Sequence, residues 1–189
     1  MAEIVAAKIK GNRLGQVVLA FKGQTSDFQP SAIRTIAEFA KLRMNRANAE
    51  QIISGGERGA KSGVSPQWPP LSKKYARWKQ FRYPGRPILV RDQTLFRDAI
   101  NGSVVDLQMG GGRSGFKLQW NAPVGTTKKG GRDPYGILHQ FGIISGITSQ
   151  RKLRPWVVMT GADAAAITNF TSDVLVGQIK QQLLIALGK

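Results

Sequence analysis

The sequence predicts an α+β fold in which a small antiparallel sheet packs against helices. Apolar residues recur with a helical period over residues 30–50 and 161–187, whereas in a central stretch they alternate with polar neighbours. A chain of 189 residues, 41% of them apolar, can bury one core but is short for two. We therefore expect a single domain over 1–189 with two extended basic loops, at about 54–70 and 122–134.

The first third of the chain predicts a strand followed by two helices. Residues 3–10 are typical of a strand and end in the turn signal Gly11-Asn12. Over residues 13–22 the apolar spacing i, i+3, i+4, i+7 favours a short amphipathic helix (Leu14, Val17, Val18 and Phe21). Pro30 can begin the next helix, whose apolar stripe continues to about residue 50 (Ile33, Ile36, Ala37, Ala40, Met44 and Ala47).

The middle third predicts a loop and two short helices. Residues 54–70 contain too many Gly, Ser and Pro residues for regular structure. Residues 71–79 are typical of basic helical turns with one aromatic face (Leu71, Tyr75 and Trp78). Asp92 can cap a helix over 93–100, whose apolar side is formed by Leu95, Phe96, Ala99 and Ile100.

The last third predicts a hairpin and a long C-terminal helix. Apolar residues alternate on both sides of the glycine-rich segment 110–115 (Val105, Leu107 and Met109, then Phe116, Leu118 and Trp120). Thr160 and Asp163 match a capping box that begins a helix over 161–187. The apolar face of this helix is wider than a surface helix needs, so we expect burial on two sides, one of them in a neighbouring subunit. The residues expected to bury surface, in a subunit contact or against the sheet, are Leu175, Ile179 and Leu183.

Basic residues dominate the charge, because 28 Lys and Arg against 11 Asp and Glu give +17. Residues 61–100 carry nine basic and two acidic side chains, whereas residues 161–189 carry two of each. A field of this kind attracts polyanions. Aromatic residues are interleaved with the central cations, a mixture typical of nucleic-acid surfaces and also of ordinary aromatic packing under a basic surface (Trp68, Tyr75, Trp78, Phe81 and Tyr83).

The chain lacks the residues that disulfides, metal sites, cofactor sites and membrane helices require. The chain has no cysteine, which excludes disulfides, thiolate metal sites and cysteine nucleophiles. One histidine and eleven scattered acids predict no metal and no cofactor. No apolar run approaches the roughly 20 residues of a membrane helix, and charges interrupt the N-terminal segment, so we expect a protein used inside a cell without a membrane partner.

His139 is the only histidine and the obvious candidate for catalysis. Ser145 and Asp133 are near it in sequence, but they complete no recognisable triad, so we expect a packed or hydrogen-bonded histidine and no enzyme. The segment 110–115, Gly-Gly-Gly-Arg-Ser-Gly, matches the residue pattern of a dinucleotide-binding loop. That loop must lie between a strand and a helix, whereas strand patterns flank this segment on both sides, so we expect a hairpin loop. The segment 55–62 has Ala60 where a phosphate-binding loop needs glycine.

The order of several short motifs resembles the tailed-phage virion morphogenesis family, which includes the Mu-type and P2-type tail completion (neck) proteins. The resemblance spans roughly residues 30–185. Its motifs are, in order, Trp68-Pro-Pro-Leu-Ser followed by Lys79, Leu89-Val-Arg-Asp-Gln-Thr-Leu-Phe-Arg-Asp-Ala-Ile100, two strands, Tyr135-Gly-Ile-Leu-His-Gln-Phe-Gly142, and Arg154-Pro-Trp ahead of a C-terminal helix.

The resemblance implies a structural virion protein of the head-to-tail junction or tail end, assembled in the host cytoplasm. It implies a homo-oligomeric ring, expected to be a hexamer, with neighbours such as a tail terminator or head-tail adaptor. The motif residues would be structural, and Tyr135, His139, Gln140 and Gly142 would fix a turn against the sheet (with Trp68, Leu71, Leu95, Arg154 and Pro155 as the other motif residues). The alternative is a free nucleic-acid-binding protein that uses residues 61–100.

A basic glycine loop at residues 125–132 is the expected partner contact. Ordering eight such residues costs on the order of 8–16 kcal/mol of backbone entropy, and the loop has almost no apolar surface to offset it. If a partner orders it, Lys128, Lys129 and Arg132 predict that the partner is negative, either DNA in a channel or the acidic rim of an adjoining ring. The alternative is a solvated loop that keeps the protein soluble.

Overall fold

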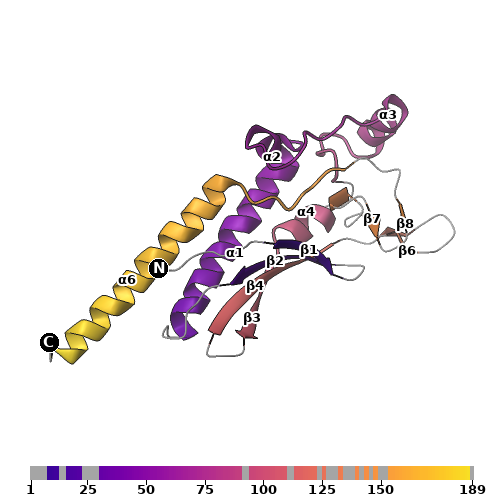
Figure 1. The fold of residues 1–189 in the computed structure, drawn as a ribbon. Helices are drawn as coiled ribbons and strands as arrows, with labels where there is room; N and C mark the ends of the chain where they lie inside the picture. The colour runs from indigo at the N-terminus through magenta and orange to yellow at the C-terminus, as the bar shows by residue number, and fades with distance from the viewer. Residues whose placement is uncertain are drawn as a thin grey trace.

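The computed structural model has the predicted α+β architecture (Figure 1). The elements are β1 (Lys8–Asn12), β2 (Gln16–Lys22), α1 (Pro30–Ile53), α2 (Glu57–Lys61), α3 (Lys73–Arg82), α4 (Thr94–Ala99), β3 (Ser103–Met109), β4 (Arg113–Asn121), β5 (Gly125–Thr126), β6 (Arg132–Asp133), β7 (Ile143–Ile144), β8 (Ile147–Thr148) and α6 (Gly161–Ala186). The structure describes residues 8–12, 16–22, 30–90, 94–109, 113–122, 125–126, 132–133, 139–140, 143–144, 147–148 and 153–187.

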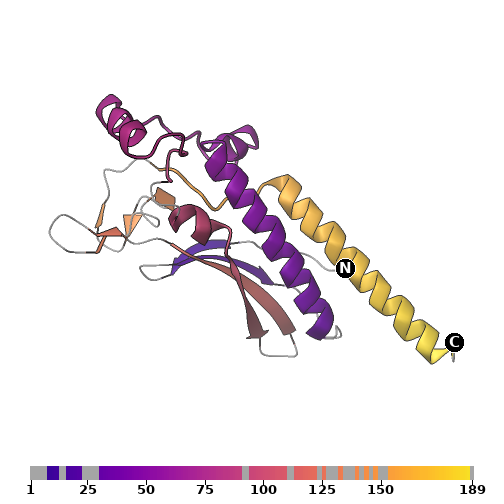
Figure 2. The ribbon, with the colours of Figure 1, turned by 180° about the vertical axis from the view of Figure 1, so that it is seen from behind.

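The two long helices and the main sheet form three layers. α1 lies on the sheet, where it contacts β3 and β4, and it also contacts α6. Two views related by a half turn place α6 on the outside of α1, away from the sheet, with the C-terminus at the end farthest from α3 (Figures 1 and 2). The free end of α6 and the α3 region are therefore opposite extremities of the molecule.

The sheet has four antiparallel strands in the order β1-β2-β4-β3. The helix expected over 13–22 is wrong, because residues 16–22 form the inner strand β2. This short apolar run fits both periods, and the sheet selects the strand by pairing its alternate apolar residues with those of β4 (Val17 with Trp120, Leu19 with Leu118 and Phe21 with Phe116). The strand expected at 3–10 is described only from residue 8, in β1.

The predicted hairpin is confirmed as β3 and β4, with a correction to one of its faces. Phe116, Leu118 and Trp120 of β4 are buried as expected. On β3, however, Val104 packs against the core, whereas Val105 is 37% exposed. The register explains the difference, because Val104 lies opposite Leu118 and paired residues share a face.

α1 follows the predicted apolar stripe and carries the centre of the core. Ala37, Ala40 and Met44 have no exposed surface, and the small alanines allow the sheet and α6 to approach the helix closely. One polar side chain on this helix fastens the sheet, because Asn45 Oδ1 accepts hydrogen bonds from Trp120 Nε1 at 2.7 Å and from the Gly102 backbone N–H at 3.1 Å.

The loop expected over 54–70 contains a short helix, α2, so that prediction is wrong for residues 57–61. The cause is tertiary: Gln51 Oε1 on α1 accepts a hydrogen bond from the Gly59 backbone N–H at 2.8 Å. Gly56 precedes the helix with φ +92°, and a Cβ at that position would collide with the Trp68 indole. In the loop expected at 122–134, residues 125–126 and 132–133 pair as the two-residue strands β5 and β6.

The two other short helices lie close to their predicted positions. α3 begins two residues later than the expected 71–79 and continues to Arg82. In α4, Ala99 is buried and Phe96 is half-buried as expected, whereas Ile100 is 41% exposed. The proposed cap Asp92 lies outside the described residues.

Candidate functional site

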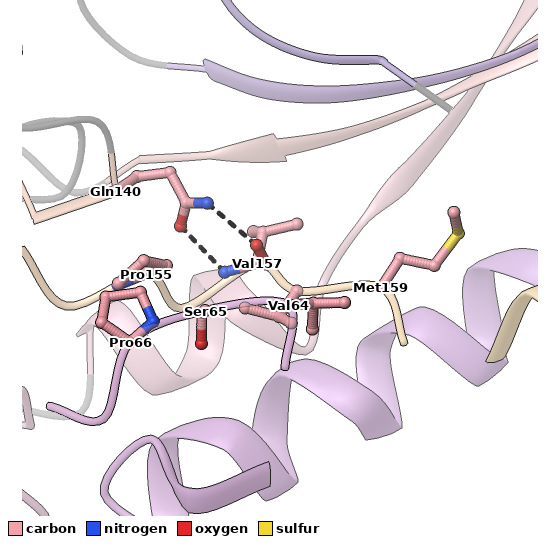
Figure 3. A pocket seen from close by; sticks show the side chains of 8 residues that line it. Val64, Ser65, Pro66, Gln140, Pro155, Val157 and Met159 are labelled. Atoms are coloured by element: carbon pink, nitrogen blue, oxygen red, sulfur yellow. Dashed lines mark hydrogen bonds between the residues drawn. The ribbon is translucent and has the colours of Figure 1, made fainter. Parts of the chain in front are cut away.

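Residues 153–160 form an extended segment that leads into α6, and we call it the strap. Trp156 and Val157 in its middle have no exposed surface. The Gln140 side chain binds the strap as a neighbouring strand would. Oε1 accepts from the Val157 backbone N–H at 2.9 Å, and Nε2 donates to the Val157 carbonyl at 2.8 Å (Figure 3). Oε1 also accepts from the Trp156 backbone N–H at 2.8 Å. One glutamine thus satisfies three buried backbone groups.

The other motif residues meet on the same strap. The Pro155 carbonyl accepts hydrogen bonds from Trp68 Nε1 at 3.1 Å and from Gln51 Nε2 at 3.0 Å. The Arg154 backbone N–H donates to the His139 carbonyl at 2.9 Å, and its guanidinium donates to the carbonyls that follow Trp68 (Pro69 at 3.0 Å and Pro70 at 3.5 Å). Burial lowers the pKa of Arg154. Trp68, His139, Gln140, Arg154 and Pro155 therefore come together as one unit.

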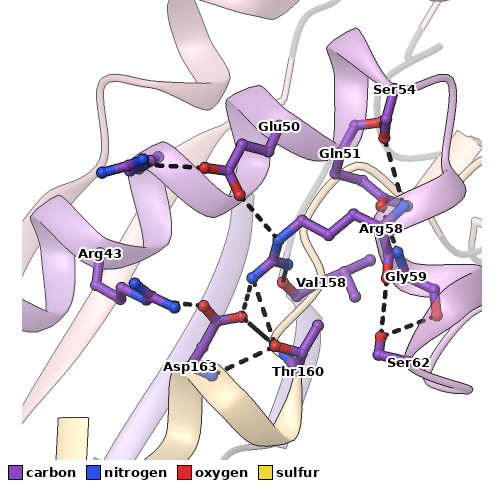
Figure 4. A network of polar contacts seen from close by, with 11 residues as sticks. Arg43, Glu50, Gln51, Ser54, Arg58, Gly59, Ser62, Val158, Thr160 and Asp163 are labelled. Carbon is purple, nitrogen blue, oxygen red and sulfur yellow. Dashed lines mark hydrogen bonds and ion pairs between the residues drawn. The ribbon is translucent and has the colours of Figure 1, made fainter. Parts of the chain in front are cut away.

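A fully buried carboxylate joins the strap to three helices (Figure 4). Asp163 Oδ1 accepts from Arg43 Nε on α1 at 2.9 Å, and Oδ2 pairs with Arg58 on α2. Oδ2 also accepts from the Thr160 backbone N–H at 2.9 Å and from the Thr160 hydroxyl at 2.8 Å. The Thr160 hydroxyl accepts from the Asp163 N–H at 3.3 Å in return, which confirms the predicted capping box.

Asp163 is charged despite its burial. Burial opposes its ionisation, but the hydrogen bonds from Arg58 and Thr160 outweigh that cost and lower the pKa of the carboxyl. Arg58 completes the network by binding Glu50 Oε2 at 3.3 Å and the Val158 carbonyl at 3.2 Å. The end of the strap is thus fixed by charge as well as by hydrogen bonds.

A cavity of about 330 Å³ opens beside the strap (Figure 3). Its lining is mostly apolar (Val64, Ser65, Pro66, Gln140, Pro155, Val157, Val158 and Met159). The side-chain oxygen and nitrogen of Gln140 are already hydrogen-bonded to the strap. The other polar side chain of the lining is Ser65, whose buried Oγ has no hydrogen-bond partner among the described residues. The cavity therefore offers a ligand mainly apolar contact, with one hydroxyl to orient it.

The expected subunit contacts divide into two kinds. Leu175 is 7% exposed and belongs to the core, whereas Ile179 is 51% and Leu183 57% exposed. The buried side of α6 packs on α1, where the Phe39 and Phe170 rings stack with centroids 4.0 Å apart. Burial on two sides is thus not achieved within one chain, and residues 179–185 are all exposed.

The remaining predicted residues are described only in part or lie outside the described residues. Leu71 is half-buried just before α3, and Leu95 lies in α4 with only its backbone described. Arg132 is paired with Thr126 in the β5–β6 ladder. Tyr135, Gly142, Lys128, Lys129 and Ser145 lie outside the described residues.

Sequence reasoning missed Gln51, Arg58 and Arg43 as parts of this unit. Gln51 continues the apolar stripe of α1 four residues after Ala47, so a polar residue on a buried face was a usable signal. Arg58 gave no local signal, because its partner Asp163 is 105 residues away.

Other classes of site are not found in the described part of the chain. It contains no group of three or more His, Cys, Asp or Glu residues that could hold a metal ion. None of its helices has the length and apolarity needed to cross a membrane. No family model, no curated protein and no solved structure matches the chain.

Proposed function

We propose that this chain is a structural protein of a phage neck or tail end, forming a homo-oligomeric ring that completes the tail and joins it to the head. The observation that carries the proposal is an exposed apolar face on α6, opposite the side packed on α1. We call it the α6 outer face, and its residues lie at i, i+3, i+7 and i+11. They are Val176, Ile179, Leu183 and Leu187, which are 48, 51, 57 and 71% exposed.

A second copy of the chain is the partner that best fits this face. Two copies that each carry +17 repel one another, so their contact needs a surface without net charge. Residues 161–189 provide one, because they carry two basic and two acidic side chains. Burying four half-exposed aliphatic side chains contributes on the order of 3–6 kcal/mol per contact. A ring requires that the α6 outer face of each copy pack head-to-tail on a different surface of the next copy, because two identical faces packed on each other would give only a dimer.

The strap supports the assignment to the tail completion family. Residues from three of the motifs that carry the resemblance meet there, and each binds backbone: Trp68, Gln140 and Arg154. His139 contributes its carbonyl to the same unit. Backbone-binding roles of this kind are expected of a scaffold, and the contacts of Thr160 and Asp163 fix the end of the strap to the first turn of α6.

In this proposal the ring is a hexamer, seated between a tail protein such as a terminator and a head-tail adaptor. The basic loop with Lys128, Lys129 and Arg132 contacts either DNA in the channel or an acidic rim of the adjoining ring. The function of the ring in this proposal is mechanical, and the proposal assigns no catalytic activity to the protein.

The test is the mass of the purified protein at low and high salt, with electron microscopy of the product. For the wild type we expect a closed ring that persists in high salt, because apolar contacts hold it. For Leu183→Asp we expect a monomer whose fold melts at the same temperature as a wild-type monomer. In phage assembly, the same variant should leave filled heads and tails unjoined.

The matched control is Gln182→Asp, which adds the same charge at an exposed position on another side of α6. It should assemble like the wild type. A wild-type protein that is monomeric at every concentration and salt, or a Leu183→Asp variant that assembles and joins tails normally, would contradict the proposal.

A further inference from the structure

α3 lies at the end of the molecule opposite the free end of α6 (Figure 2). One side of this helix presents exposed cations and aromatic rings. Lys74, Trp78 and Phe81 follow the i, i+4, i+7 spacing of one helical face, with Arg77 and Arg82 beside them. We call these five residues the α3 outer face. Phe81 is 89% exposed and Trp78 46% exposed, and all three cations are exposed.

The opposite side of α3 holds this face in place. Lys79 is 4% exposed, and its ammonium group donates to the Arg86 carbonyl at 2.9 Å and to the Pro87 carbonyl. The Trp78 ring stacks on Tyr75 at 5.2 Å and meets the edge of Tyr83 at 5.8 Å between centroids. The aromatic surface is thus preorganised, so little entropy is lost when a flat ligand stacks on it.

Charge decides what kind of partner fits. Residues 58–91 contain nine Lys and Arg and no Asp or Glu. Among the described ion pairs, none involves a cation of the α3 outer face. A second copy of the chain would bring like charge to this surface, whereas phosphates bind the cations and bases stack on exposed rings.

We propose that the α3 outer face is a binding site for single-stranded nucleic acid, in which the cations hold phosphates and a base stacks on Phe81 and Trp78. Duplex DNA offers the phosphates but keeps its bases paired, so exposed rings favour an unpaired strand or a frayed duplex end. The inference goes beyond the proposed ring and does not depend on it, because α3 and the α6 outer face lie at opposite ends of the molecule.

Tryptophan fluorescence gives a direct readout of this site. Trp68, Trp120 and Trp156 are at most 4% exposed, so Trp78 is the one tryptophan that a ligand can reach. We expect a twelve-nucleotide oligothymidylate to quench the emission at low salt and Trp78→Phe to remove the quenching. Binding should weaken as salt rises, with a logarithmic slope of about 0.7 for each phosphate contacted.

Variants separate stacking from charge. Phe81→Ala should weaken oligothymidylate binding about tenfold without changing the salt slope. Lys74→Gln with Arg77→Gln should reduce the slope by about 1.4. The matched double control is Arg34→Gln with Lys180→Gln, two exposed cations on α1 and α6 whose loss should leave the binding unchanged or nearly so.

Three results would overturn the inference. The first is no binding of oligothymidylate at low salt. The second is equal affinity and equal quenching with a ligand that offers no unpaired bases, either heparin, a polyanion without bases, or duplex DNA, when compared with oligothymidylate. The third is a Phe81→Ala variant that binds like the wild type. Ring assembly is measured separately by mass, so a failure here leaves the ring proposal standing, and the reverse is also true.

Discussion

Asp163→Asn is expected to destabilise the fold by about 3 kcal/mol, the lower end of the range for breaking a buried ion pair by removing one partner. The lower end applies because the two arginines are affected unequally. Arg43 is already 36% exposed at its side chain and can turn to solvent. Arg58 is 15% exposed and keeps Glu50, itself half exposed, as its one carboxylate partner beside the neutral acceptors of Val158 and Thr160. The asparagine also retains an acceptor for Thr160.

The assay is urea unfolding together with thermal melting. A loss of about 3 kcal/mol corresponds to a fall in Tm of about 6–12 °C for a chain of this size. Asp173→Asn is the matched control, because Asp173 lies on the same helix, is exposed and undergoes the same change of charge. That control should stay within about 0.5 kcal/mol of the wild type.

The pH dependence tests the electrostatic part of the reasoning. The pKa of Asp163 is lowered in the folded protein, so its contribution is fully present above the pKa of an unfolded Asp, about 3.9. It is lost as pH falls through the lower folded-state pKa. The stability difference between wild type and Asp163→Asn should therefore shrink below about pH 4. A variant as stable as Asp173→Asn, or a difference that grows on acidification, would refute the reasoning.

Two further substitutions test the strap and the turn before α2, each by urea unfolding. Gln140→Leu leaves three backbone groups of the strap without a hydrogen-bond partner and should lower the free energy of unfolding by at least about 3 kcal/mol. The control Gln80→Leu, at an exposed position on α3, should change it very little. Equal effects of the two substitutions would show that the strap does not depend on Gln140. Gly56→Ala combines a positive φ with a collision against Trp68, so it should lower the free energy of unfolding clearly more than Gly63→Ala, where φ is positive but the surrounding space is open. Equal losses of about 1–2 kcal/mol for both substitutions would refute the collision.

Local signals determined the long elements. The stripe from Ile36 to Ala47 and the capping box at Thr160 predict α1 and α6 because helical period and helix capping depend on residues within a turn or two. The alternation on β4 predicts its buried face for the same reason. The width of the apolar surface of α6 predicts two contact sides, of which the structure shows the one packed on α1, and the second stays a prediction.

Contacts between distant residues decided the rest. The apolar spacing within residues 13–22 favours a helix, and only pairing with β4 makes residues 16–22 a strand. α2 depends on the Gln51 side chain, and the core-facing residue of β3 depends on register.

By itself, the sequence determined the fold class, the positions of α1 and α6, and the concentration of charge in residues 61–100. Only the tertiary structure brought Trp68, Gln140 and Arg154 onto one strap, paired Arg58 with Asp163 across 105 residues, and left the α6 and α3 outer faces exposed. The reason is physical: periodicity and capping are energies of neighbouring residues, whereas burial and ion pairing depend on which surfaces meet once the chain has closed on itself.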